Sequence, residues 1–147
     1  MSAGPTRARP PFRFSVRLRV GFDETDAQAV VYYGRYLPYF DHARTEYHRH
    51  LGSLGIEGAE FVMRASTVEY HAPARFDDLL EVFARISRLG RTSVTYDLCA
   101  TRLPDDALMV TATQTVVLIS RETRRPVPIP DAAREPIRAF EGADLVE

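Results

Sequence analysis

The sequence predicts an α+β domain in which an antiparallel sheet curls around one long helix. Three observations support this: a strand-like segment comes first, a single amphipathic helix follows it, and four further strand-like segments come after the helix with short connections. The 147 residues, 45% of them hydrophobic, suffice for one domain with its own core. We therefore expect a single domain over residues 14–147.

The first strand is expected at residues 14–22, FSVRLRVGF, where apolar and polar side chains alternate without exception. Such alternation is typical of a half-buried strand. Residues 1–13 contain three prolines and few apolar side chains. They bury too little apolar surface to offset the entropy of ordering, so we expect a flexible N-terminal leader.

A long helix is predicted after an acidic loop. Apolar residues recur at spacings of four, three, four and four, at Tyr36, Phe40, Ala43, Tyr47 and Leu51. This spacing places them along one face of a helix. Because Pro38 is tolerated only near a helix start, the helix should begin around Arg35 and end before Gly52.

Four β-rich segments follow the helix, at residues 59–72, 78–89, 91–103 and 107–121. Turn residues separate them, and short connections imply antiparallel neighbours. The last two segments are longer than ordinary strands, which predicts a strongly curved sheet. After Arg121 we expect a proline-rich extended segment and a short terminal helix. A sheet of this kind leaves an edge, so oligomerisation is also expected.

Composition excludes several classes of function. The net charge is −1 and no basic stripe is interleaved with aromatic residues, so we expect no nucleic-acid partner. No apolar run resembles a signal peptide or reaches the length of a membrane span. With Cys99 as the single cysteine, no internal disulfide can form, and we expect a cytoplasmic protein without a membrane partner.

Metal and nucleotide chemistry are not predicted either. His48 and His50 diverge on the predicted helix and His42 lies on another face, so all three are interpreted as solvated helix positions and no metal site is expected. Ser53 lies outside any G-x-S-x-G pattern and is interpreted as part of the turn that ends the helix. The neighbouring glycines lack the spacing of a phosphate-binding loop.

The acidic loop is the candidate functional site. Residues 22–36, FDETDAQAVVYYGRY, place three acidic residues directly before the predicted helix. One interpretation is an exposed turn in which aspartate and Thr25 side chains cap backbone N–H groups. The other is a carboxylate that serves as nucleophile or general base, beside helix N-terminal amides that stabilise an oxyanion. A thioester suits such a site, because its thiolate leaves with little acid assistance.

The motif FDETDAQAVVYYGRYLPYFDHARTEY resembles the signature of the hotdog-fold thioesterases of the 4-hydroxybenzoyl-CoA thioesterase and YbgC-like group. The resemblance continues through VEYHAPARFDDLLEV and RPVPIP and covers roughly residues 14–140. It implies a hotdog fold and hydrolysis of an acyl-CoA substrate. It also implies no separate cofactor, since CoA is part of the substrate, and a homodimer or homotetramer with active sites between protomers.

The resemblance places the family's catalytic aspartate on Asp26, which either attacks the thioester carbon or activates water. It places the oxyanion donor on the backbone N–H of Tyr33, at a position where many relatives carry histidine. Asp23 and Glu24 are then interpreted as loop scaffolding. Tyr32 and Tyr36 are candidates for lining the acyl tunnel, with an ordinary core role as the alternative.

For the phosphates of CoA, the resemblance points to the segment RLGRTS at residues 88–93. Arg91 and Ser93 are the candidate binding residues, and Arg88 is a weaker one. The alternative for each arginine is an ordinary solvated charge.

Ala29 departs from the family pattern, which usually has glycine at this position. If the glycine adopts a positive φ, alanine strains the loop by about 1 kcal/mol or more; if it only permits close approach of substrate, alanine narrows the pocket. The alternative function is therefore a non-hydrolytic protein that binds acyl thioesters. A hydratase is a third possibility, which would need a histidine near the acidic loop.

Overall fold

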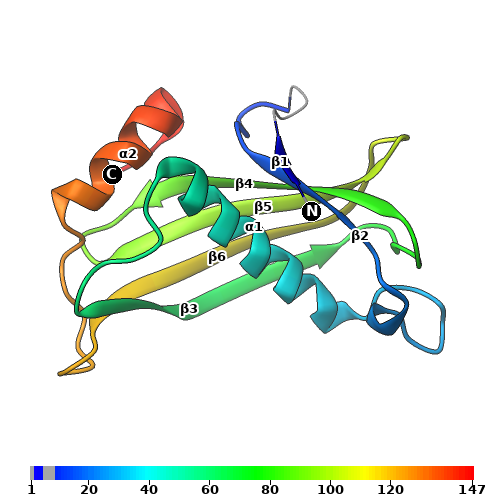
Figure 1. The fold of residues 1–147 in the computed structure, drawn as a ribbon, viewed down its shortest axis with the longest axis horizontal. Coiled ribbons are helices and arrows are strands. Elements are labelled where there is room, and N and C mark those ends of the chain that lie inside the picture. Colours follow the sequence, from blue (N-terminus) through cyan, green and yellow to red (C-terminus); the bar gives the residue numbers. More distant parts are fainter. Residues whose placement is uncertain (1, 5–8) are drawn as a thin grey trace.

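The computed structural model describes residues 2–4 and 9–147 (Figure 1). Its elements in chain order are β1 (Ser2–Gly4), β2 (Ser15–Arg19), the short 3-10 turns η1 (Phe22–Glu24) and η2 (Tyr33–Arg35), α1 (Tyr36–Leu51), β3 (Ala59–Tyr70), β4 (Leu79–Leu89), β5 (Ser93–Leu103), β6 (Ala107–Ser120), α2 (Asp131–Glu141) and η3 (Gly142–Asp144). Each predicted strand and helix is present, and the predicted bounds differ from these by a few residues.

The sheet is antiparallel and has the strand order β1-β2-β4-β5-β6-β3. Short turns join β4, β5 and β6, whereas β3 follows α1 and returns to pair with β6 at the far edge. Figure 1 shows α1 lying across one face of this sheet. The predicted α+β hotdog fold, a curved antiparallel sheet around one long helix, is confirmed.

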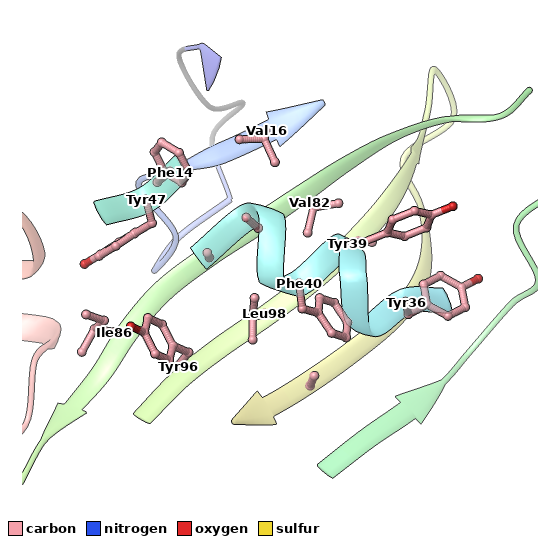
Figure 2. Close-up of a cluster of buried hydrophobic side chains, with 14 of the residues drawn as sticks. Phe14, Val16, Tyr36, Tyr39, Phe40, Tyr47, Val82, Ile86, Tyr96 and Leu98 are labelled. Carbon is pink, nitrogen blue, oxygen red and sulfur yellow. The ribbon is translucent and has the colours of Figure 1, made fainter. Parts of the chain in front are cut away.

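The core forms between α1 and the concave face of the sheet. Phe40, Ala43 and Tyr47 are fully buried, as the apolar spacing predicted. Figure 2 shows Phe40 beside Leu98 of β5, with the other side chains of this helix face along the sheet. The helix ends at Gly52, whose φ of 97° is a left-handed conformation that glycine adopts without strain. Among the described residues, neither helix combines the length and apolar composition that crossing a membrane requires.

Part of the predicted flexible leader contacts the domain. Ser2–Gly4 pairs with β2 and extends the sheet. The ring of Phe12 lies 5.8 Å from that of Phe83, and the guanidinium of Arg9 lies 5.7 Å from the same ring. Residues 1 and 5–8 are outside the described residues. The domain boundary at residue 14 stays a prediction.

The terminal helix α2 is anchored through Glu141, a fully buried acid. Its Oε2 accepts hydrogen bonds from the hydroxyl of Tyr47, at 2.5 Å, and from the amide of Ile86, at 3.0 Å. The guanidinium of Arg13 lies 3.5 Å from Oε1. One carboxyl group therefore joins α2 to α1 and β4.

Burial raises the pKa of Glu141 above its ordinary value of 4.5, against the opposing effect of its hydrogen bonds and of Arg13. Because the folded-state pKa exceeds the unfolded-state pKa, this group favours folding most at acid pH, and its contribution is lost as the pH rises through the folded-state value. Glu141→Gln keeps an acceptor for Tyr47 but cannot ionise, so we expect its stability to fall less with rising pH. Chemical denaturation from pH 4 to pH 8 measures the free energy of unfolding of the wild type and the variant. Parallel profiles for the two proteins would contradict the expectation.

Candidate active site

The acidic loop between β2 and α1 folds into a small hairpin. The amide of Asp26 donates to the carbonyl of Val30 at 3.0 Å, and the amide of Ala29 donates back to the carbonyl of Asp26 at 2.9 Å. Farther from the tip, the amide of Tyr32 donates to the carbonyl of Glu24 at 3.1 Å. These backbone bonds close the loop and place Asp26 at its tip.

The carboxylate of Asp26 is half-buried, and its Oδ1 accepts a hydrogen bond of 2.8 Å from the amide of Gln28. This is the turn in which an aspartate side chain caps the backbone two residues on, so the capping expected of the aspartate is confirmed. Thr25 does not cap an amide, because its hydroxyl donates to the carbonyl of Phe22 at 2.8 Å. Among the hydrogen bonds of the described residues, none is made to Oδ2. One oxygen thus orients the carboxylate while the other is available for chemistry, and the catalytic role of Asp26 stays a prediction.

Helix N-terminal amides lie in the same loop. Tyr33 begins η2, which leads directly into α1, and the amides of a first helical turn have no acceptor within the helix. They also lie at the positive end of the helix dipole. Two backbone hydrogen-bonded pairs lie on this hairpin, Glu24 with Tyr32 and Asp26 with Val30. They are two residues apart along each strand of the hairpin, a separation of about 7 Å in an extended chain. The loop therefore brings a carboxylate close to backbone donors suited to an oxyanion.

Glu24 ties this loop to the helix. Its Oε1 accepts hydrogen bonds from the amide of Gly21 at 2.6 Å and from the hydroxyl of Tyr39, on α1, at 2.8 Å. Burial, reinforced by Glu24, raises the pKa of Tyr39, so the phenol stays protonated and donates. The scaffolding role predicted for Glu24 is confirmed.

Two of the three tyrosines at the start of the helix are exposed and one is buried. Tyr32 and Tyr33 are exposed, with 55% and 62% of their surface accessible. Tyr36 is 2% exposed, and its hydroxyl accepts a hydrogen bond from the amide of Ala74 at 3.3 Å. Tyr36 is therefore a core residue in this structure, whereas Tyr32 is free to contact a ligand.

Tyr70, at the end of β3, is a contributor that the sequence did not reveal. Its hydroxyl donates to the carbonyl of Tyr33 at 3.2 Å, and its ring centroid lies 5.2 Å from that of Tyr33. It also contacts the ring of Tyr36 at 5.8 Å. The partners are 37 residues apart in the chain, so no local pattern signals the contact.

Ala29 adopts a left-handed conformation with φ of 62°. Of the two explanations for the usual glycine, the structure therefore supports the conformational one. This region costs a residue with a Cβ atom about 1–2 kcal/mol. The hairpin that carries Asp26 is strained at its tip.

We expect Ala29→Gly to raise the free energy of unfolding by about 0.5–1 kcal/mol, because relief of the left-handed strain exceeds the added entropy of glycine in the unfolded chain. Ala27→Gly is the matched control. Ala27 lies in the same turn without a positive φ, so its replacement should lower stability. Denaturant titration of both variants measures the difference, and a loss of stability in both would show that Ala29 carries no strain.

The predicted phosphate-binding residues lie at the opposite end of the sheet. Arg91 and Ser93 follow β4, and Arg91 is exposed. The loop of Asp26 is next to the start of β4, where the amide of Val20 donates to the carbonyl of Asp78 at 2.9 Å. The 11 residues of β4 separate the two ends by roughly 30 Å. Figure 1 shows the two ends of β4, and a single chain does not bring the two sets of residues together.

The prediction that His48 is solvated was wrong. Its Nε2 lies 2.5 Å from the hydroxyl of Tyr96 on β5, because the sheet curls far enough to cover this flank of α1. Burial, with a smaller contribution from the Arg44 cation, lowers the pKa of His48 to about 4. The imidazole is therefore neutral at neutral pH. Within the described part of the chain, no three histidine, cysteine or acidic side chains gather as a metal site would require.

Comparison with known proteins identifies the family. The sequence model of the Thioesterase superfamily matches residues 28–109, more than half of the chain. The chain belongs to the thioesterase superfamily. The match contains Tyr33 and begins two residues after Asp26, so it includes the helix start of the candidate site but not the carboxylate.

Two relatives named YbgC resemble the chain. The acyl-CoA thioesterase YbgC of Haemophilus influenzae is 34% identical over 123 residues, 80% of this chain and 88% of that protein. The acyl-CoA thioester hydrolase YbgC of Escherichia coli O6:H1 is 43% identical over 89 residues. That alignment covers 58% of this chain and 65% of the relative, less than two thirds of its length. The predicted resemblance to the YbgC-like group is confirmed.

A solved thioesterase structure has the same fold. The thioesterase of Thermus thermophilus, crystallised with coenzyme A and zinc, is 30% identical and superimposes with a TM-score of 0.79. The match covers 91% of this chain and 98% of that one. The curved sheet and the central helix of this chain are thus those of a known thioesterase structure.

Proposed function

We propose that this protein hydrolyses acyl-CoA thioesters to a free acid and CoA. The observation that carries the proposal is the hairpin loop, which holds the carboxylate of Asp26 and the N-terminal amides of α1 in one short segment. The names of the two YbgC relatives and the coenzyme A in the Thermus thermophilus structure support the substrate class.

In the proposed reaction, the amide of Tyr33 donates a hydrogen bond to the thioester oxygen as negative charge develops on it. The carboxylate of Asp26 either attacks the carbonyl carbon, forming a mixed anhydride that water then hydrolyses, or removes a proton from an attacking water. The CoA thiolate leaves unaided, since a thiol has a pKa of about 8.5. Tyr70 acts as a positioning residue, because it holds the carbonyl of Tyr33.

Binding of the whole CoA moiety is proposed to require a second copy of the chain. Asp26 and Arg91 are roughly 30 Å apart in one protomer, at opposite ends of β4. β3 is an edge strand of the sheet, so its unpaired backbone groups can pair with a partner. We place Arg91 and Ser93 of one protomer on the phosphates and Tyr32 of the other beside the acyl group, in a homodimer or homotetramer.

Light scattering after size-exclusion chromatography measures the oligomeric state. A monomer would refute the proposal that two copies of the chain share the CoA site.

The experiment that tests the activity is hydrolysis of a panel of acyl-CoAs, with aliphatic chains of two to sixteen carbons and aromatic acyl groups, followed by released thiol. The proposal expects cleavage of at least one class at a rate well above the spontaneous rate. If no acyl-CoA or acyl-carrier thioester is cleaved, the protein is not a thioesterase.

The strained tip of the loop favours one alternative, a protein that binds acyl thioesters without cleaving them. Ala29 holds a conformation that glycine adopts more readily, so the loop is strained where the carboxylate must be placed. Calorimetric binding of an acyl-CoA without release of thiol would support this alternative. Turnover by the wild-type protein would exclude it.

A further inference from the structure

A pocket lies beside the C-terminal half of α1, between this helix, β3 and α2. Its volume is about 570 Å³. Leu54, Phe61 and Met63 form part of its apolar wall, with 58%, 37% and 45% of their surface exposed. These exposed apolar side chains leave the pocket room for a hydrocarbon chain.

The guanidinium of Arg44 is held at this pocket. The side chain is 16% exposed, donates to Oε1 of Gln114 and to Oδ1 of Asp41, the latter at 2.5 Å, and lies 5.7 Å from the ring of Tyr96. Gln114 is 1% exposed, and its amide donates to the hydroxyl of Ser66 at 3.0 Å. This second bond turns the oxygen of Gln114 toward Arg44, so the cation is fixed rather than mobile.

One cation and one carboxylate, Arg44 and Asp41, line the pocket as a pair. His48 is neutral at neutral pH, so Arg44 carries the only positive charge among the described residues that line the pocket. Its carboxylate partner Asp41 is 62% exposed at the side chain, and such a pair is easily exchanged with water. A ligand carboxylate can therefore replace Asp41 without stranding a buried charge.

A guanidinium has five N–H donors in a planar fork that matches a carboxylate, and the two bonds to Gln114 and Asp41 leave others for a ligand. The apolar walls require that the carboxylate arrive on a hydrocarbon chain. CoA phosphates fit poorly, because they carry several charges and this pocket offers one cation.

We propose that the pocket binds the far end of the acyl group and that Arg44 recognises a carboxylate there, so that the preferred substrates are CoA monothioesters of dicarboxylic acids. This inference rests on the proposed function and names its substrate class. Arg44 is eleven residues beyond Tyr33, roughly 16 Å along the helix axis. Within one protomer the acyl chain must be long enough to cover that distance, and a site shared between protomers would select another length.

The test compares matched pairs of ligands that differ only in a terminal carboxylate, with even chain lengths from four to sixteen carbons. Binding is measured calorimetrically with non-hydrolysable thioether analogues, and turnover with the thioesters. For each chain length, the readout is the affinity, or kcat/KM, for the carboxylated ligand divided by that for the plain ligand. A general loss of activity affects both values and cancels in this ratio. The proteins are the wild type, Arg44→Gln, Asp41→Asn and Arg49→Gln.

We expect the wild-type binding ratio to exceed about tenfold at one or more chain lengths, as charge-assisted hydrogen bonds would produce. Arg44→Gln should reduce that ratio to near one, and Asp41→Asn, which removes the competing carboxylate, should increase it. Arg49→Gln removes an arginine from the same helix outside the pocket and should leave the ratio unchanged.

Two failures are distinguishable. If the plain thioesters are hydrolysed but no chain length shows a ratio that depends on Arg44, the carboxylate inference is overturned and the proposed function stands. If no thioester is hydrolysed, the function fails, and the thioether analogues still decide the inference through their binding ratios. Should Arg44→Gln fail to fold, an unchanged ratio in Asp41→Asn overturns the inference.

Discussion

Replacing Asp26 by asparagine should lower kcat/KM for acyl-CoA hydrolysis by about 10²- to 10⁴-fold, the range for loss of an acid–base group. Asparagine keeps an oxygen that can accept the 2.8 Å bond from the amide of Gln28, so the turn should persist. It removes the negative charge needed to attack a carbonyl carbon or to take a proton from water. Initial rates of thiol release measure the loss.

The matched control for this variant is Asp23→Asn. Asp23 is an exposed acid in the same loop, and its replacement removes the same charge three residues from Asp26. We expect it to retain activity within a few fold. Equal thermal melting of both variants would show that the fold is intact, and an Asp26→Asn protein with near wild-type turnover would remove Asp26 from the mechanism.

Tyr33→Pro should lower kcat by about 10²- to 10³-fold, as loss of one oxyanion donor does in other hydrolases. Proline deletes the backbone N–H that the mechanism uses. The site tolerates it structurally, because Tyr33 is the first residue of its helical turn, where that N–H has no helical acceptor. The preceding Tyr32 has φ −62° and ψ 141°, the extended geometry that proline requires of its neighbour.

Tyr33→Ala separates the main chain from the side chain. It removes the exposed ring and its contact with Tyr70 but keeps the amide, so kcat should fall far less than in Tyr33→Pro. Steady-state kinetics on one acyl-CoA compare the two. If alanine costs as much as proline, the phenol rather than the backbone carries the function of Tyr33.

The fold was predictable because its elements have strong local periodicity. The helix expected from around Arg35 to before Gly52 is Tyr36–Leu51, and its core face is the face that the spacing of Phe40, Ala43 and Tyr47 predicted. The apolar face of the helix is the buried face because the sheet curls around a single helix. The first strand is shorter than predicted, since the chain turns into η1 after Arg19 although apolar alternation continues to Phe22.

The candidate site was predictable only where it is local. Asp26, Glu24 and Tyr33 lie within ten residues of one another, and hydrogen bonds along the loop hold them near the helix start. Tyr70 could not be found this way, because the contact with Tyr33 depends on the return of β3 beside β6. His48 was misjudged for the same reason, since its partner Tyr96 comes from a strand far along the chain.

The sequence by itself determined the fold class and marked the acidic loop before the helix as the candidate site. Both depend on interactions between near neighbours, which leave a local pattern. The role expected of Asp26 came from the resemblance to a known family. Only the tertiary structure decided that Ala29 is left-handed, that Arg91 lies at the far end of the sheet from Asp26, and that Arg44 is held over a pocket by Gln114. These depend on backbone conformation and on the register of distant strands, which residue spacing does not encode.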